Sequence, residues 1–554
     1  MRASSTQTAS KKGSVTLLDT DRKQDVFIAA SLFLLGILTR LPFAGEILYH
    51  WDAINFAKAL ERFDVWAGQP HVPGYILYVA LTKIVHFFLP DAQATLVSVS
   101  MVSSALAVVF LYFLGRDVFN RTTGWIAALF LAASPLFWFY GEIALPHTLD
   151  ALVVIVLVWL LYRILQGEFH LVIPAAIGLG IAGGLRPQTQ VFLLPLALYV
   201  GWRIGFRRAI QAGIVLTLVN LAWFIPLIWF TGGIRMYFYI MGKYSSHFNE
   251  TTSIFSAGML GFSRNMRKLV MYTAYGWSLF AIPSAVAVML FGWRQLVKAA
   301  EPRWRDRLLS SVRSLNTPRF WFFVLWMAPS LAYYALIHMG QQGLVFTFLP
   351  ALFLLSAAAL EYLSRRRQPV GQVLLASFVI INAAIFLAAP TYPLGGESFK
   401  LLTLDTIREH DTFYQARFEG VQENFSPAHT LLITYEWVFS DYYLRYFEHV
   451  QYKIGARGEA GDGLPAIRRS YTVDPSERGL RPDGDGYLYL VIMDEPLLSY
   501  NHSKSRLETI PLSDGSQLHF LRFKPNEWVY LGSESFGLVP QHILVPLEEA
   551  DWDG

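Results

Sequence analysis

The residues best suited to chemistry lie near the start of the chain. His50-Trp-Asp52 is followed by Gly68-Gln69-Pro-His71-Val-Pro-Gly-Tyr75, and these two short segments together hold one acid and two histidines. An acid beside a helix N-terminus stays ionised, which suits a base that accepts a hydroxyl proton. The alternative is that Asp52 only caps the helix that follows it. His50, Gln69 and His71 are candidates for substrate binding, or amphipathic anchors at a membrane interface.

A second group of polar residues stands between two apolar runs. Glu142 occurs in Phe139-Tyr-Gly-Glu-Ile-Ala-Leu-Pro-His-Thr-Leu-Asp150, and His147 and Asp150 open the run that follows. An acid at membrane depth is costly and is therefore a functional candidate. The alternative is a surface acid in a turn at the interface. We expect Glu142 to act as a second catalytic acid, with His147 and Asp150 in substrate binding; the sequence leaves open whether Glu142 or Asp150 is the essential second acid.

Arg186 interrupts an apolar stretch between Gly183-Gly-Leu and Pro187. Glycine and proline at these positions predict a broken helix that lines a cavity, where non-helical backbone is tolerated. A guanidinium there can bind a phosphate through two hydrogen bonds, or it can extend to the interface as an anchor. Lys243 could add positive charge over the same site. Gln341 and Gln342 occupy a later polar turn, and Gln342 is the candidate for substrate binding; ordinary loop positions are the alternative for all three.

The composition defines the setting for these residues. Of 554 residues, 54% are hydrophobic and 16% are charged, whereas soluble proteins carry about 25% charged residues. A chain with so few charges is an integral membrane protein. The absence of cysteine excludes disulfides and thiolate metal sites. A divalent metal ion is left open, since the sequence offers no dedicated cage for one.

A helix needs about 20 apolar residues to cross the membrane. Apolar runs close to this length recur along the chain. We predict about eleven transmembrane helices, at 26–43, 93–115, 124–140, 148–166, 170–185, 188–203, 208–231, 271–293, 320–338, 344–363 and 370–389.

The apolar segment 72–90 decides the orientation. If it stays in the outer interface, the basic residues of the remaining loops fall on the inner side, as the positive-inside rule prefers. We therefore expect a cytoplasmic tail (1–25), a transmembrane catalytic domain (26–392) with a first outer loop and juxtamembrane helices (44–92), and a second long outer loop (232–270). The location is the inner or plasma membrane.

From about residue 395 the pattern changes to alternating stretches typical of strands, at Thr430–Tyr435, Tyr487–Met493 and Gln517–Phe523. This predicts a soluble α/β domain over 393–554, placed in the periplasm or outside the cell. The fold class is thus an all-α polytopic membrane protein with a C-terminal soluble α/β domain. No Walker-type phosphate loop, zinc-spaced histidine pair or nucleotide-binding glycine fingerprint occurs, and no nucleic acid partner is expected.

Together these motifs resemble the GT-C superfamily of membrane glycosyltransferases, and more closely its bacterial protein O-mannosyltransferase-like and aminoarabinose-transferase-like branch. The resemblance covers roughly residues 25–390. It is carried by Asp52 in the first outer loop and by four motifs: Gln69-Pro-His-Val-Pro-Gly-Tyr75, Tyr140-Gly-Glu-Ile-Ala-Leu-Pro, Gly183-Gly-Leu-Arg-Pro187 and Gly343-Leu-Val-Phe-Thr-Phe-Leu-Pro350.

The resemblance implies a polyprenyl-phosphate-linked sugar donor and the first-loop acid, Asp52, as catalytic base. Two positions depart from the family pattern: Ala53 follows the acid where mannosyltransferases have a second acid, and no lysine precedes Gly74-Tyr75. Arg186 falls where the branch has a cavity lysine, so Arg186 and His71, helped by Lys243, are expected to bind the donor phosphate.

The sequence therefore favours an inverting glycosyltransferase acting on a glycan, lipid or protein acceptor, with membrane lipids around it. The alternative from another class is a transporter or lipid flippase that uses the same intramembrane charges, and a third is a non-catalytic relative. Transporters often show broken helices in matching halves; the sequence shows one such break, at Arg186.

Overall fold

The computed structural model describes residues 7–299, 317–391, 400–434, 437–451, 479–493, 507–525, 529–531 and 541–544. The chain divides into two compact units, Met1–Ile407 and Arg408–Gly554. The boundary expected from the change in composition lies at 392/393, a little before this division.

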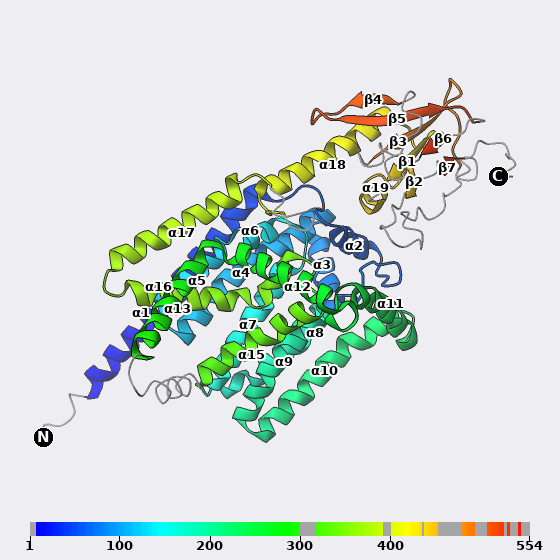
Figure 1. Ribbon diagram of the computed structural model, residues 1–554. Coiled ribbons are helices and arrows are strands. Elements are labelled where there is room, and N and C mark those ends of the chain that lie inside the picture. The colour runs from blue at the N-terminus through cyan, green and yellow to red at the C-terminus, as the bar shows by residue number, and fades with distance from the viewer. Residues whose placement is uncertain are drawn as a thin grey trace, which may run out of the picture. The chain divides into compact units, whose positions relative to one another are not determined.

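The first unit is built from helices that follow the predicted apolar runs (Figure 1). Its long and short helices are α1 (Gln7–Arg40), α2 (Trp51–Glu61), α3 (Ile76–Phe88), α4 (Ala92–Val118), α5 (Arg121–Ala132), α6 (Pro135–Glu142), α7 (His147–Leu165), α8 (Val172–Leu185), α9 (Pro187–Ile204), α10 (Phe206–Phe230), α11 (Ile234–Thr252), α12 (Ile254–Trp277), α13 (Ala281–Ala299), α15 (Pro318–Leu336), α16 (Leu349–Ser364) and α17 (Gln368–Ala388). Among the described residues, the 3-10 turns η1 (Leu41–Phe43), η2 (Phe169–Leu171), η3 (Ser278–Phe280) and η4 (Gln342–Thr347) accompany them.

The polytopic membrane fold is confirmed, but the expected count of about eleven spans is not reached. In the described residues, six helical segments are long and apolar enough to cross a membrane, or up to seven if the pair α5 and α6, bent by 60°, forms one span. All eleven predicted runs are largely helical. Several are shortened by breaks, as at Arg186 and at the turn η4, because Pro, Gly and polar residues interrupt them.

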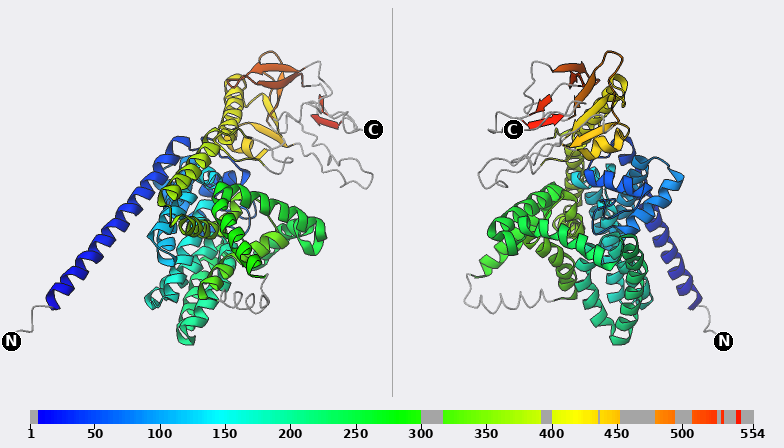
Figure 2. Two further views of the ribbon diagram at one scale, coloured as in Figure 1. Left: turned by 60° about the vertical axis from the view of Figure 1, so that its left-hand side comes forward. Right: turned by 90° about the vertical axis from the view of Figure 1, so that its right-hand side faces the viewer.

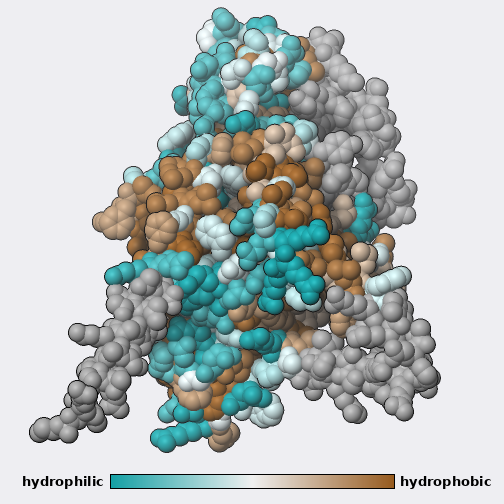
Figure 3. All heavy atoms as spheres, turned by 90° about the vertical axis from the view of Figure 1, so that its left-hand side faces the viewer, coloured by the Kyte–Doolittle hydropathy of each residue, from teal (hydrophilic) through white to brown (hydrophobic). Residues whose placement is uncertain are grey.

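The centre of the first unit is α4, which packs against α1, α5 and α7. Close approach to α5 depends on Gly115, since a Cβ there would lie 2.7 Å from the Cα of Gly124. By contrast, α10 exposes Ile214, Leu218 and Trp229. Figure 2 shows α1 at the border of the bundle in both views, and Figure 3 shows hydrophobic residues spread over a broad part of the surface. Apolar side chains exposed in this way suit contact with lipid.

The segment 44–92 contains the two expected short helices, α2 and α3. With 13 residues, α3 is about 20 Å long, which is less than the roughly 30 Å of the hydrocarbon core. The connection between α2 and α3 packs onto α10 and α11 through a buried cluster of Val65, Val72, Leu227 and Tyr237. Gly74 is required there, because its φ is +102° and a Cβ would lie 2.6 Å from Leu227 Cδ1.

The prediction of a long loop over 232–270 is wrong, because α11 and the first part of α12 occupy it. Polar residues in this stretch hide an amphipathic pattern, in which Tyr237 is buried against the first loop while Phe238 and Tyr239 are exposed. Gly258, with φ 58°, breaks the helical backbone inside α12. The segment therefore forms a bent pair of helices that packs together.

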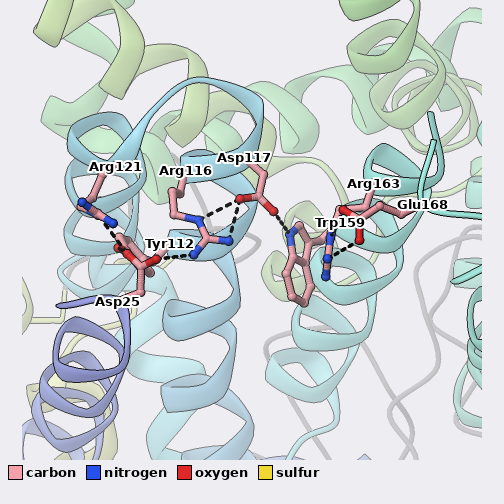
Figure 4. Close-up of polar contacts among 8 residues, drawn as sticks. All are labelled: Asp25, Tyr112, Arg116, Asp117, Arg121, Trp159, Arg163 and Glu168. Carbon is pink, nitrogen blue, oxygen red and sulfur yellow. Dashed lines mark hydrogen bonds and ion pairs between the residues drawn. The ribbon is translucent and has the colours of Figure 1, made fainter. Parts of the chain in front are cut away.

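A cluster of charged residues links α1, α4, α5 and α7 (Figure 4). The carboxylate of Asp25 accepts hydrogen bonds from Arg116 Nη1 at 2.6 Å and from Arg121 Nε at 2.9 Å. Arg116 also pairs with Asp117, and Arg163 pairs with Glu168. Arg116 and Arg163 lie in the last turns of α4 and α7, and Arg121 opens α5, so these three helix ends lie close together.

The second unit contains a mixed sheet of five strands in the order β2-β1-β3-β5-β4. Its strands are β1 (Thr430–Thr434), β2 (Glu448–Gln451), β3 (Leu488–Ile492), β4 (Glu508–Pro511) and β5 (Gln517–Phe523), while β6 (Val529–Leu531) and β7 (Gln541–Leu544) pair separately. The first three strands of the order are parallel, and β5 is antiparallel to β3 and β4. All three predicted strands are thus confirmed.

In the described part of this unit the helices are α18 (Leu404–Asn424), which begins just before the unit boundary, and α19 (Trp437–Tyr443). Their aromatic residues stack: the ring centroids of Tyr414 and Phe439 lie 4.6 Å apart, and those of Phe418 and Tyr443 lie 4.9 Å apart. In β5, Leu518 and Phe520 are buried on one face and Leu521 and Phe523 on the other. The alternation over its first half, from Gln517 to Phe520, explains why the strand was readable in the sequence.

Candidate active site

The helix α2 presents Asp52 at its second position. Its N-cap is His50, whose Nδ1 accepts a hydrogen bond from the Asp52 backbone nitrogen at 3.0 Å. The helix is held by a buried apolar face that includes Ile54, Phe56 and Leu60. Because His50 does the capping, the Asp52 carboxylate is left for other contacts. The alternative of Asp52 as N-cap therefore does not apply.

Three side chains converge on the Asp52 carboxylate. Gln341 Nε2 donates a hydrogen bond to Oδ2 at 2.7 Å. His71 Nδ1 lies 3.2 Å from Oδ1, and His50 Nδ1 lies 3.4 Å from Oδ2. His50 Nδ1 either accepts the hydrogen bond from the Asp52 backbone N–H or carries a proton that it donates to the carboxylate; it cannot do both. The contact with the backbone N–H is the shorter of the two. Gln341 is therefore the firm hydrogen-bond donor to Asp52.

The charge state of Asp52 follows from two opposing effects. Burial acts to raise the pKa of the carboxyl, but the neighbouring imidazoles of His71 and His50 and the Gln341 hydrogen bond outweigh it, so the pKa lies below its usual value. Burial lowers the pKa of His71, and the charge of Asp52 opposes that effect. Asp52 is thus a carboxylate at neutral pH.

The hydrogen-bonded chain continues from Gln341 to α7. Gln341 Oε1 lies 2.6 Å from His147 Nε2. A carboxamide oxygen only accepts hydrogen bonds, so His147 carries a proton on Nε2. Its other nitrogen, Nδ1, lies 3.4 Å from Arg186 Nη1. Asp52 and Arg186 therefore belong to one network, although they stand on separate elements.

Arg186 lies in the predicted break between α8 and α9, with extended backbone at φ −156° and ψ 103°. Its Nη1 lies 3.1 Å from Asp150 Oδ2, and the hydroxyl of Thr189 donates to the other oxygen of Asp150. Its side chain is 9% exposed. In the described residues, Arg186 Nε is buried without a hydrogen-bond partner, so the guanidinium keeps a donor for an anion.

Of the predicted site residues, the structure brings together Asp52, His50, His71, His147, Asp150 and Arg186. Glu142 lies apart from them. It is fully buried beside Arg40, whose guanidinium donates to Ser104 Oγ at 2.9 Å and lies over the Trp138 ring at 5.3 Å. None of the described hydrogen bonds connects the Glu142 carboxylate to the Asp52 network.

The remaining predicted residues surround the network or lie away from it. Gln69 pairs its backbone with that of Asp64. Lys243 is exposed on α11 beside Tyr244, whose ring stacks on His71 with centroids 6.4 Å apart. Gln342 points elsewhere, with its Nε2 donating to the carbonyl of Lys400 at 2.9 Å.

Sequence reasoning left Gln341 undecided and missed Thr189. Neither stands in a motif with a recognisable spacing: Gln341 lies 289 positions after Asp52 along the chain, and Thr189 resembles any polar residue in a first helical turn. The one available signal was that Gln341 occurs in a polar turn between apolar runs. As for metals, no group of three or more His, Asp or Glu side chains suited to hold an ion occurs among the described residues.

Comparison with known proteins adds evidence from outside the chain. Residues 70–230 match the family model described as dolichyl-phosphate-mannose-protein mannosyltransferase. No curated protein sequence matches. Among solved structures, ArnT from Cupriavidus metallidurans bound to undecaprenyl phosphate has a TM-score of 0.52 at 13% identity, covering 90% of this chain and 97% of that chain.

Two further structures are similar at lower TM-scores. The apo state of the same ArnT has a TM-score of 0.48 at 12% identity, covering 93% of this chain and 98% of that chain. The apo oligosaccharyltransferase of Archaeoglobus fulgidus has a TM-score of 0.45 at 12% identity, covering 84% of this chain and 69% of that chain. The likeness to undecaprenyl-phosphate-bound ArnT shows the fold.

Proposed function

We propose that this chain, which has the fold of the GT-C membrane glycosyltransferases, transfers a sugar from a polyprenyl-phosphate donor to an acceptor hydroxyl on the outer face of the membrane. The predicted resemblance to that superfamily is confirmed by the ArnT-like fold and by the family model over residues 70–230. We propose in addition that the acceptor group is a hydroxyl and that the site faces the outer side of the membrane.

One observation carries it: a carboxylate and a buried guanidinium share a single hydrogen-bonded network. Asp52 is joined through Gln341 and His147 to Arg186. In the described residues, Arg186 Nε is buried without a hydrogen-bond partner. A buried donor of this kind suits an anion that brings its own acceptor oxygens.

In the proposed reaction, Asp52 accepts the proton of the acceptor hydroxyl while that oxygen attacks the anomeric carbon. The bond between the anomeric carbon and the phosphate oxygen breaks, and the lipid phosphate leaves with the electron pair. Arg186, with His71, stabilises the charge of the leaving phosphate. We leave Glu142 out of the bond-making steps, because none of the described hydrogen bonds or ion pairs joins its carboxylate to the Asp52 network.

The test is transfer of labelled sugar in reconstituted vesicles supplied with a panel of polyprenyl-phosphate sugars and an extract of envelope acceptors. Asp52→Asn keeps the shape of the side chain but cannot accept the proton. We expect its transfer rate to fall about 10²–10⁴-fold, while polyprenyl-phosphate affinity stays within about threefold.

The matched control is Asp91→Asn, because Asp91 caps α4 through Ala94 N at 2.7 Å and asparagine caps helices equally well. Transfer by Asp52→Asn at the wild-type rate would contradict the role of the base. Movement of intact donor between leaflets without cleavage would instead support the flippase alternative.

A further inference from the structure

The residue that joins the two halves of the proposed site is Gln341, at the start of the turn η4. This turn is anchored by buried side chains, among them Leu344 and Phe346, and by Trp326 Nε1, which donates to the carbonyl of Thr347 at 2.9 Å. It also presses directly on His147, because a Cβ at Gly343 would lie 2.5 Å from His147 Cγ. The backbone that carries Gln341 is therefore held in place independently of its amide.

The amide of Gln341 can adopt only one orientation. Asp52 is ionised and can only accept, so the group that faces it at 2.7 Å must be the NH₂. The carbonyl oxygen then faces His147 and accepts its Nε2 proton at 2.6 Å. Each end of the amide thus matches the charge state of its partner, and reversing it would set two acceptors against each other.

This orientation also determines what His147 offers to Arg186. With its proton on Nε2, a neutral imidazole has a lone pair on Nδ1, and that atom lies 3.4 Å from Arg186 Nη1. Arg186 is held from its other side by Asp150 at 3.1 Å. The position of the Arg186 guanidinium is therefore linked, through His147, to the Gln341 amide that contacts Asp52.

We propose that Gln341 is a positioning residue that orients the Asp52 carboxylate and fixes the His147 tautomer, so that the base and the phosphate-binding arginine are aligned together. The proposal rests on the proposed glycosyltransferase function and deepens it. Gln341 itself exchanges no proton with the substrates; it acts through Asp52 and His147.

The substitution that isolates this role is Gln341→Glu, which preserves side-chain length. A carboxylate at this position cannot donate to Asp52 unless it is protonated, and two carboxylates at this distance cannot both ionise readily. The charged and titratable groups that face the pair come from several elements: His50, His71, Tyr75, His147, Asp150, Arg186 and Tyr244. All of them are retained in the variant, so a change in pH dependence reports on the new carboxyl.

We expect Gln341→Glu to lower kcat about 10- to 100-fold at neutral pH, with the donor KM changed less than about threefold. Its activity should rise as the pH falls by about one to two units, where the shared proton restores a donor to Asp52, whereas wild-type activity should not. Gln341→Leu, which removes both hydrogen bonds, should lose kcat at every pH. Gln415→Glu, at an exposed position on α18 that bonds only Glu419 in the described contacts, is the control for added charge.

The outcomes separate the two claims. If wild type transfers sugar and Asp52→Asn does not, but Gln341→Glu keeps the wild-type kcat and pH profile, the positioning role is overturned and the function stands. If wild type transfers no sugar, the proposed function itself fails. A fall in melting temperature and activity with an unmoved pH profile would also overturn the proposal, since that is the signature of a purely structural residue.

Discussion

Arg186 and Asp150 form an ion pair that is almost completely buried, with side chains 9% and 7% exposed. Removal of one member of such a pair leaves an uncompensated charge, at a cost of about 3–5 kcal/mol. A single substitution at Arg186 would therefore mix the proposed loss of donor binding with a loss of stability. The two effects can be separated by neutralising both partners.

The double substitution Arg186→Met with Asp150→Asn should retain the fold but bind polyprenyl phosphate less tightly. The asparagine side chain introduced in this variant can still accept the hydrogen bond from Thr189, and the methionine fills the volume of the arginine stem. We expect the melting temperature to stay nearer to wild type than that of Arg186→Met alone, and the affinity for polyprenyl phosphate to fall at least about tenfold, which is about 1.4 kcal/mol.

The measurement is binding of labelled polyprenyl phosphate to the purified protein. Arg62→Met serves as the control, because Arg62 is 79% exposed and pairs with Asp64 at 2.9 Å away from the network. Wild-type affinity in the double variant would exclude Arg186 as the phosphate ligand.

Helices α4 and α5 approach each other so closely at Gly115 and Gly124 that a side chain at position 115 would not fit. The Cβ that alanine would add at position 115 lies 2.7 Å from the Cα of Gly124 and 2.9 Å from Leu354 Cδ2. The first of these atoms is backbone and cannot rotate away. Small residues at such crossings let helix backbones pack tightly in a membrane.

Gly115→Ala should therefore separate α4 from α5 and destabilise the first unit by about 1–3 kcal/mol. The control is Gly213→Ala in α10, where no atom lies within 4 Å of the added Cβ and alanine favours the helix by about 1 kcal/mol. Thermal unfolding in detergent should show a lower melting temperature for the first variant only. Equal melting temperatures would mean that the crossing is able to relax.

Features that depend on residues close together in the sequence could be predicted from it, whereas contacts between residues far apart along the chain could not. The strand at Gln517–Phe523 and the break at Arg186 were readable because hydrophobic alternation and Gly/Pro punctuation act locally. The partner of Asp52 was not, since Gln341 meets it only after the intervening helices have packed. The segment 232–270 was misread because Tyr237 buries its ring against Val65 and Val72 of the distant first loop.

The stability of the whole molecule should depend on pH through His338, which follows α15. Burial, helped by the charge of Lys268, lowers the pKa of His338 to about 4. In the unfolded chain the pKa is about 6.5. Between these values the unfolded state binds more protons, so stability is present above about pH 6.5 and is lost as the pH falls toward about 4.

His338→Gln should flatten this acid loss, which we expect to be about 1–3 kcal/mol in wild type. Thr252 Oγ1 donates to the carbonyl of Ile337 at 3.0 Å and lies 3.2 Å from His338 Nδ1, so the glutamine amide can still donate to this hydroxyl. Melting temperatures measured from about pH 7.5 to about pH 4.5 would reveal the difference, with His170→Gln, at an exposed position, as control. Parallel profiles for wild type and His338→Gln would contradict the assignment.

The span of 289 positions between Asp52 and Gln341 also has a consequence for biosynthesis. At about 5–20 residues per second, a ribosome needs on the order of 15–60 seconds to reach Gln341 after Asp52 has been made. Until then the nascent chain holds its acid without the amide that orients it. The chain thus assembles the Asp52–Gln341 contact only when nearly all of the first unit has been made, and a truncated translation product would carry the acid without its amide partner.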